Sequence, residues 1–143
     1  MNFRQFMEKG VVRKAQPDIQ LARALIAMSD SQIATIEKLE ITDITASTIM
    51  SNLYEALRQI AEAIAAKEGY KVYSHEAYTY YLKEKGEDIL AAKFDRFRKI
   101  RNGIHYYGKS IEKESVKSNK EEILRIIDML KTKFLKDVAA APQ

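Results

Sequence analysis

Apolar residues recur along most of the chain at the three- and four-residue spacing of an amphipathic helix. This pattern predicts helices over residues 17–39, 44–67, 75–85, 87–108 and 118–134. A further turn is expected at residues 2–9. No segment alternates apolar and polar residues with a period of two, so no strand is expected. The positions predicted to face the core are Ala22, Leu25, Ile26, Ile33, Ile36, Ile49, Leu53, Leu57, Ile60, Ile64, Leu90, Phe94, Phe97, Ile100, Ile104, Ile123, Ile126, Ile127, Leu130 and Phe134.

Residues that start or stop helices stand at the ends of these segments. Pro17 suits the first position of a helix, because the N–H that it lacks would be unpaired there anyway. Gly69 is placed to end the second helix, and Ser74 is placed to cap the start of the third. Ser118 and Glu121 have the spacing of a capping box. The last helix is therefore expected to begin at residue 118.

The short links between the predicted helices favour antiparallel neighbours. We therefore expect an all-α fold, an up-and-down bundle of four to five helices. The length of 143 residues fits a single helical-bundle domain over residues 1–143. Its core is expected over about residues 17–137, with a frayed C-terminal tail at 138–143.

The composition excludes several kinds of site. The chain has no Cys, so disulfides, thiolate metal sites and cysteine nucleophiles are excluded. Its 2 His are too few for a His-rich metal cluster, so no metal and no cofactor are expected. No apolar run approaches the ~18 residues of a membrane span, and the N-terminus lacks the apolar stretch of a signal peptide. We expect a cytoplasmic protein without a membrane partner.

The positive charge is concentrated in one part of the sequence. The whole chain has a net charge of +4, whereas residues 93–109 alone carry six Lys and Arg against one Asp. All the other residues together are therefore slightly negative. A basic excess confined to one window indicates an anionic partner such as RNA or a nucleotide. The alternative is a solvated helix face that happens to be basic.

The predicted helix over 87–108 gathers four functional side chains on one flank of its apolar stripe. At 100° per residue, Arg98, Arg101, His105 and Asn102 fall within one sector beside the stripe. Arg donors match phosphate oxygens, and imidazole can take a proton from a ribose 2′-hydroxyl and return one later. This set could therefore cleave RNA without a metal. Alternatively, the arginines pair with acidic residues of a neighbouring helix and His105 binds a free carbonyl at the helix end.

Two other features have both a functional and a structural interpretation. His75, in the first turn of the third helix, is expected to be structural. The tyrosines between residues 70 and 81 could stack on nucleotide bases. At helical spacing, however, Tyr78 and Tyr81 are expected to bury their rings and leave the hydroxyl groups at the surface.

The stretch YEALRQIAEAIAAKEGYKVYSHEAYTYYL, followed by FRKIRNGIHYYGK, resembles the HEPN family of small prokaryotic helical proteins. In that family a long helix ends in a Gly turn and a Ser-His-Glu step opens a short helix. The next helix carries R-x(4–6)-H, often with Asn directly after the Arg. The resemblance covers roughly residues 20–136.

The resemblance implies a bundle of four or five helices that forms a homodimer, with two copies of the motif making one RNA cleft. Many family members are toxins whose partner is a minimal nucleotidyltransferase antitoxin. In some systems this partner adenylylates a Tyr two places after the His, which is Tyr107 in this chain.

The motif can be aligned with this sequence in two ways. Counted from Arg98, the spacing is R-x6-H to His105, and Tyr107 completes the pattern two residues later. In this alignment Lys99, rather than a small polar residue, follows the Arg.

Counted from Arg101, the expected Asn102 is present, but His105 comes one residue too early and Tyr106 occupies its place. This second alignment argues for a non-catalytic or weakly active member. We favour the first, because Arg98, Arg101 and His105 share a helix face in either case.

Two functions follow as hypotheses, with a purely structural oligomeric helper as a third. In a metal-independent endoribonuclease, the toxin of a toxin–antitoxin pair, His105 would be the general base or acid. Arg98 and Arg101 would hold the phosphate, and Asn102 would orient the other groups. In a non-catalytic module, the same basic edge would bind RNA, a nucleotide or a nucleotidyltransferase. Further nucleic-acid contacts are expected from Arg96, Lys99, Tyr106 and Lys109.

Overall fold

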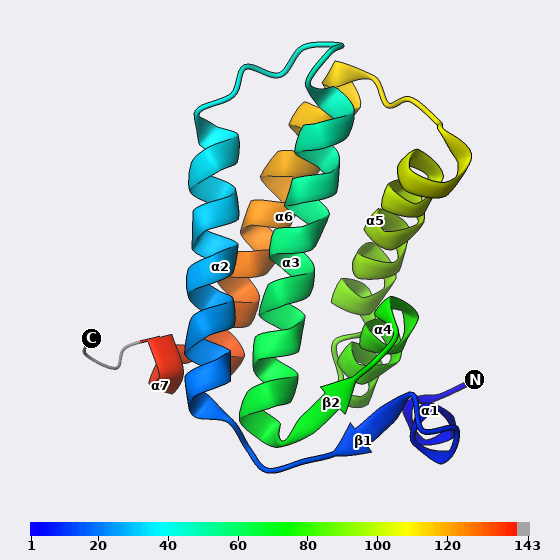
Figure 1. The fold of residues 1–143 in the computed structure, drawn as a ribbon, viewed down its shortest axis with the longest axis vertical. Helices are drawn as coiled ribbons and strands as arrows, with labels where there is room; N and C mark the ends of the chain where they lie inside the picture. Colours follow the sequence, from blue (N-terminus) through cyan, green and yellow to red (C-terminus); the bar gives the residue numbers. More distant parts are fainter. Residues whose placement is uncertain (140–143) are drawn as a thin grey trace.

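The computed structural model describes residues 1–139, which form an all-α bundle with one small two-stranded sheet (Figure 1). The predicted all-α fold class is therefore confirmed. The elements are α1 (Phe3–Glu8), β1 (Val12–Lys14), α2 (Ile19–Glu37), α3 (Ala46–Glu68), β2 (Tyr70–Val72), α4 (His75–Glu84), α5 (Asp88–Tyr107), α6 (Lys113–Phe134) and α7 (Lys136–Ala139).

The four long helices α2, α3, α5 and α6 run alternately up and down, as the short links between them predicted (Figure 1). The short helix α4 lies against the N-terminal part of α5. Helix α3 is central, because it contacts α2, α4, α5, α6 and β2. No helix in the described part of the chain is both long enough and apolar enough to cross a membrane.

The core is built mainly around α3. All five apolar positions predicted to face inward on this helix are fully buried: Ile49, Leu53, Leu57, Ile60 and Ile64. On α5, burial decreases along the helix, because Phe94 and Phe97 are fully buried whereas Ile100 and Ile104 are only partly covered. The C-terminal half of α5 therefore leaves apolar side chains open at its sides.

The prediction that the chain contains no strand is wrong. Strands β1 and β2 pair antiparallel, with Val12 opposite Val72. Each strand has three residues, which is too short for an alternating pattern to stand out in the sequence. The pairing closes the end of the bundle, because Val12 is buried and the Gly69 carbonyl accepts a hydrogen bond from the Ala15 N–H at 2.8 Å.

Besides the start of α2, where Asp18 is the cap and Pro17 precedes the helix instead of opening it, the described elements correct three predicted boundaries. The turn predicted at residues 2–9 is α1, whose Phe3 and Phe6 extend the core to positions before residue 17. The predicted start of the frayed tail, residue 138, is too early, because Val138 is buried in α7. Residues 140–143 lie outside the described part of the chain.

The third correction concerns α6, which begins at Lys113 rather than at Ser118. Ser118 lies within the helix, so it does not form the predicted capping box with Glu121. The helix instead begins after Glu112, which has an extended backbone and makes no side-chain capping bond. Because no side chain caps this helix start, the sequence has no capping residue there that could have predicted it.

Candidate functional site

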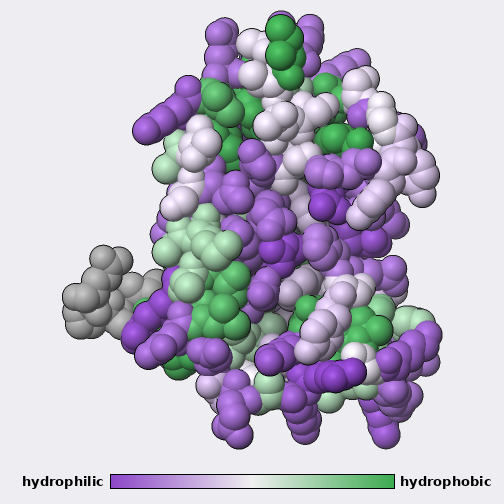
Figure 2. Space-filling model, in the orientation of Figure 1, coloured by the Kyte–Doolittle hydropathy of each residue, from purple (hydrophilic) through white to green (hydrophobic). Residues whose placement is uncertain are grey.

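Two polar stripes face each other where α3 and α5 pack side by side. The α5 stripe carries Arg98, Arg101 and His105. The α3 stripe carries polar residues at the same helical spacing: Ser51, Glu55, Arg58 and Glu62. Because the two helices run in opposite directions, the C-terminal end of the α5 stripe meets the N-terminal end of the α3 stripe. We name these seven residues the α3–α5 polar cluster. Figure 2 shows hydrophilic residues gathered at the middle of this face.

His105 lies at the exposed end of the α3–α5 polar cluster. Its Nε2 atom is 3.0 Å from the Ser51 hydroxyl oxygen, a contact that joins α5 to α3. A hollow of about 420 Å³ opens beside the ring, and its lining includes Asn52 and Ile104. The imidazole therefore has a polar partner that fixes its orientation, while one side remains open to a ligand.

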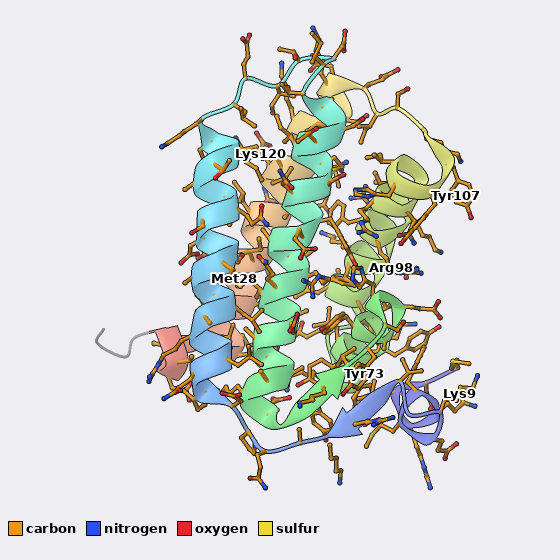
Figure 3. All side chains as sticks on the ribbon, viewed as in Figure 1. Lys9, Met28, Tyr73, Arg98, Tyr107 and Lys120 are labelled. Atoms are coloured by element: carbon orange, nitrogen blue, oxygen red, sulfur yellow. The ribbon has the colours of Figure 1, made fainter. Side chains whose placement is uncertain are left out.

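Arg98 is held by a carboxylate of its own helix. Its Nε and Nη2 atoms donate to the same Asp95 oxygen, at 3.0 and 2.8 Å. The Arg98 side chain is only 14% exposed, and it lies between α3 and α5 in Figure 3. Burial raises the pKa of Asp95, but the hydrogen bonds from Arg98 and Lys99 outweigh burial and hold this pKa below its usual value. Arg98 is therefore paired with an acid, as the structural alternative predicted, but this acid lies on the same helix and not on a neighbouring one.

Arg101 differs from Arg98, because no ion pair links it to another residue in the described part of the chain. Its guanidinium carbon lies 5.8 Å from the centre of the Tyr106 ring. Its charge also contributes to lowering the pKa values of Glu55 and His75, on α3 and at the start of α4. Arg101 is therefore the guanidinium of α5 with donors available for an added anion.

A contact between the buried Tyr54 and the half-buried His75 lies beside these residues, and sequence analysis did not identify it. The fully buried Tyr54 places its hydroxyl 3.1 Å from Nδ1 of His75. Burial raises the pKa of Tyr54 well above its usual value. Burial lowers the pKa of His75, and the positive charges of Arg58 and Arg101 add to this effect. These contacts agree with the structural role predicted for His75.

The only other arginine of the α3–α5 polar cluster is paired with carboxylates of its own helix. Arg58 bonds to Glu55 through Nε at 3.1 Å, and to Glu62 through Nη1 at 2.6 Å. Glu55 consequently has a lowered pKa, for which the hydrogen bond from Arg58 is the main cause. The positive charge of Arg58 is thus balanced on α3.

The residues after the motif are exposed at the C-terminal end of α5. Tyr106 and Tyr107 are 70% and 74% exposed, and Figure 3 shows Tyr107 at the outer edge of the bundle. Asn102 is half-buried, and its side chain makes no hydrogen bond to another residue in the described range 1–139. Tyr78 and Tyr81 bury their rings, as their spacing predicted, but at 1% and 2% exposure their hydroxyl groups are not at the surface as expected.

Of the other basic residues predicted to bind nucleic acid, Arg96 and Lys99 lie on the opposite flank of α5 and Lys109 lies in the loop that follows it. Arg96, Lys99 and Lys109 line a hollow of about 960 Å³ between α5, the following loop and α6. Arg96 pairs with Glu122 at 3.0 Å. The structure therefore does not bring these three cations together with His105. Their positions on the helix explain this separation, since residues 96 and 99 are not spaced to share a face with 98 and 105.

Within residues 1–139, no group of three or more His, Asp or Glu is arranged so that it could hold a metal ion. None of the protein-family models, curated proteins or solved structures compared with the chain matches it.

Proposed function

We propose that the protein is a metal-independent endoribonuclease of HEPN type, the toxin component of a toxin–antitoxin pair. One observation carries the proposal. Arg101 and His105 lie one helical turn apart on α5, with the exposed imidazole beside an open hollow and the guanidinium free of carboxylate partners among the described residues. An imidazole can act as the base for a ribose 2′-hydroxyl, and a guanidinium without a carboxylate partner can stabilise the charge that develops on the phosphate.

In the proposed reaction, the 2′-oxygen of a ribose attacks the adjacent phosphorus. His105 takes the proton of the 2′-hydroxyl, and the bond between phosphorus and the 5′-oxygen of the next nucleotide breaks. The protonated His105 then donates a proton to that oxygen, which leaves as a hydroxyl, so the products carry a 2′,3′-cyclic phosphate and a 5′-hydroxyl and the imidazole is neutral again. Arg101 stabilises the extra negative charge on the phosphate oxygens. Ser51 orients the imidazole through its 3.0 Å contact.

The proposal includes the assembly that the resemblance implies. Two copies of α5 would meet in a homodimer, and a minimal nucleotidyltransferase antitoxin would modify Tyr107, whose side chain is well exposed. Sedimentation velocity tests the dimer, which has twice the 16.4 kDa mass of one chain. A single 16.4 kDa species at the concentrations that cleave RNA would contradict a composite site.

The test is cleavage of a generic single-stranded RNA in EDTA. The wild type should cleave, and both His105→Ala and Arg101→Ala should lose at least about 100-fold in rate, since each removes a group that acts in the transition state. The matched control is Arg125→Ala, which removes the same charge from an exposed position on α6. Absence of cleavage by the wild type, or an unchanged rate in His105→Ala, would refute the enzymatic proposal.

The second candidate is a non-catalytic module that binds RNA, a nucleotide or a protein partner. The observation that favours it is the double hydrogen bond from Arg98 to Asp95, which leaves one free guanidinium on this flank instead of two. Such a module predicts salt-sensitive RNA binding without cleavage, weakened by Arg98→Ala and by Arg101→Ala.

A further inference from the structure

A wide hollow lies on the flank of α5 that faces away from the α3–α5 polar cluster. Its volume of about 960 Å³ is formed by the C-terminal half of α5, the loop around Lys109 and the N-terminal half of α6. This volume lies within the range found for small-molecule sites between helices. The hollow and the smaller one beside His105 share the side chain of Ile104.

The lining of this hollow combines an apolar floor with a polar rim. Ile100, Ile104 and Ile111 are half-buried apolar side chains that pack against the core. The rim carries hydroxyl and amide groups and five charged side chains, from Ser110, Ser115, Ser118, Asn119, Asp95, Arg96, Lys99, Lys109 and Glu114. Three of the charged side chains are basic and two are acidic, so the rim favours an anion.

Two of the three cations are partly neutralised by neighbouring acids, and the third is not. Arg96 pairs with Glu122 at 3.0 Å, and Lys99 contacts Asp95 at 3.1 Å. Lys109 forms no ion pair with a residue in the described part of the chain. Its ammonium group is therefore the free positive charge at this rim.

Gly103 determines where the Lys109 side chain lies. A Cβ atom on Gly103 would stand 3.4 Å from Cδ of Lys109, so the lysine stem runs over the bare surface of the glycine. The Lys109 N–H also donates to the Gly103 carbonyl oxygen at 3.0 Å. These two contacts hold the lysine over the hollow instead of leaving it in the solvent.

We propose that this hollow binds a small phosphorylated ligand with a flat apolar ring, of the size and chemistry of a nucleoside monophosphate. The ring would cover the isoleucine floor, the phosphate would contact Lys109 and Lys99, and the serine hydroxyls would bond to the sugar. Inorganic phosphate alone is too small to cover the floor, and an uncharged ring would leave Lys109 unpaired. The site stands apart from His105, so it does not depend on RNA cleavage.

The test is a titration of the ¹⁵N-labelled protein with adenosine monophosphate, adenosine or inorganic phosphate, followed by amide chemical shifts. Adenosine monophosphate should shift amides lining the hollow, and should bind at least about tenfold more tightly than either of its parts. Ser115→Trp, which fills the hollow from an exposed position, and Lys109→Ala should each weaken binding by about tenfold or more. Lys113→Ala is the matched control, because it removes the same charge from α6 outside the lining. His105→Ala should also leave binding intact.

The amide spectra show at the same time whether each variant is folded. The proposal is overturned if the wild type shows no shifts at about 5 mM ligand, a concentration that corresponds to negligible affinity. It is also overturned if Ser115→Trp and Lys109→Ala bind as the wild type does, or if the shifts fall on the α3–α5 polar cluster. Equal binding of adenosine and its monophosphate would show an apolar site only, which contradicts the proposed phosphate contact.

Discussion

Arg98 and Arg101 are neighbours on the same flank of α5, yet their guanidinium groups have different surroundings. Asp95 accepts two hydrogen bonds from Arg98, whereas Arg101 contacts an aromatic ring and has no carboxylate partner in the described chain. A guanidinium that already bonds to a carboxylate must exchange that partner before it can hold a phosphate. The binding of an added anion on this flank therefore depends most directly on Arg101.

The Arg98–Asp95 pair gives a prediction about RNA affinity. Asp95→Asn removes the negative charge that balances Arg98, so RNA affinity should rise while the free energy of unfolding falls by about 1 kcal/mol. Asp128→Asn, an equal charge change at an exposed position on α6, is the control. Fluorescence anisotropy with labelled RNA measures the affinity. The same increase in both variants would show a general charge effect and contradict the specific role of Asp95.

The half-buried His75 makes the free energy of unfolding depend on pH. Burial lowers its pKa below the ordinary value of 6.5, so the unfolded chain binds a proton at a pH where the folded chain does not. The free energy of unfolding should therefore decrease as pH falls from about 7.5 to 5.5, and the decrease should end below the folded-state pKa. Glu55 and Asp95 have lowered pKa values and contribute only at more acidic pH.

Urea denaturation of two variants at several pH values isolates this effect. His75→Gln keeps a polar group beside the Tyr54 hydroxyl but does not titrate, so the decrease between about pH 7.5 and 5.5 should be smaller in this variant. His105→Gln, at the exposed histidine, should retain the wild-type decrease. The same pH dependence in His75→Gln and the wild type would show that His75 is not its source.

At the residue scale, the sequence predicts correctly which residues share a flank of α5, but it does not predict which residues of other helices they contact. Helical spacing alone places Arg98, Arg101 and His105 on one face. The contact between His105 and Ser51 joins positions far apart in the sequence, so periodicity within one segment carries no information about it. The polar stripe of α3 has the same spacing, and its acidic residues could have indicated a charged partner helix.

Among the elements, long helices are predicted well because many turns repeat the same apolar pattern. The three-residue strands β1 and β2 give no such repetition, and their pairing depends on Gly69 at the end of α3. Gly69 has a positive φ of 88°, and a Cβ atom there would stand 2.8 Å from the Ala15 carbonyl oxygen. The tight packing around this glycine joins α3 to the small sheet.

Replacement of Gly69 should therefore be costlier than replacement of another glycine with the same backbone. Gly86 has a φ of 82° with no atom within 4 Å of an added Cβ. Gly86→Ala should lower the free energy of unfolding by about 1 kcal/mol from backbone strain, and Gly69→Ala by about 1–3 kcal/mol more from overpacking. Urea denaturation measures both. Equal losses in the two variants would contradict a packing role for Gly69.

Over the whole molecule, the basic window of the sequence divides between two surfaces. A count of charges along residues 93–109 suggests one anionic partner. Because a helix turns by about 100° per residue, however, Arg96 and Lys99 lie on a different flank of α5 from Arg101 and His105. One flank carries Arg101 and His105 next to α3, and the other carries Lys109 above the hollow beside α6. Net charge in the sequence could predict an anionic ligand but not the number of separate sites.

The central claim is that the α3–α5 polar cluster catalyses attack of the ribose 2′-oxygen on the adjacent phosphorus of RNA. It is tested most directly with two RNA oligonucleotides that differ only at the cleaved position, which carries either ribose or 2′-deoxyribose. In EDTA, the wild type should cut the ribose form to leave a 2′,3′-cyclic phosphate and should leave the deoxy form intact, because the attacking oxygen is missing. Equal cleavage of both oligonucleotides, or products with a 3′-hydroxyl, would contradict the account.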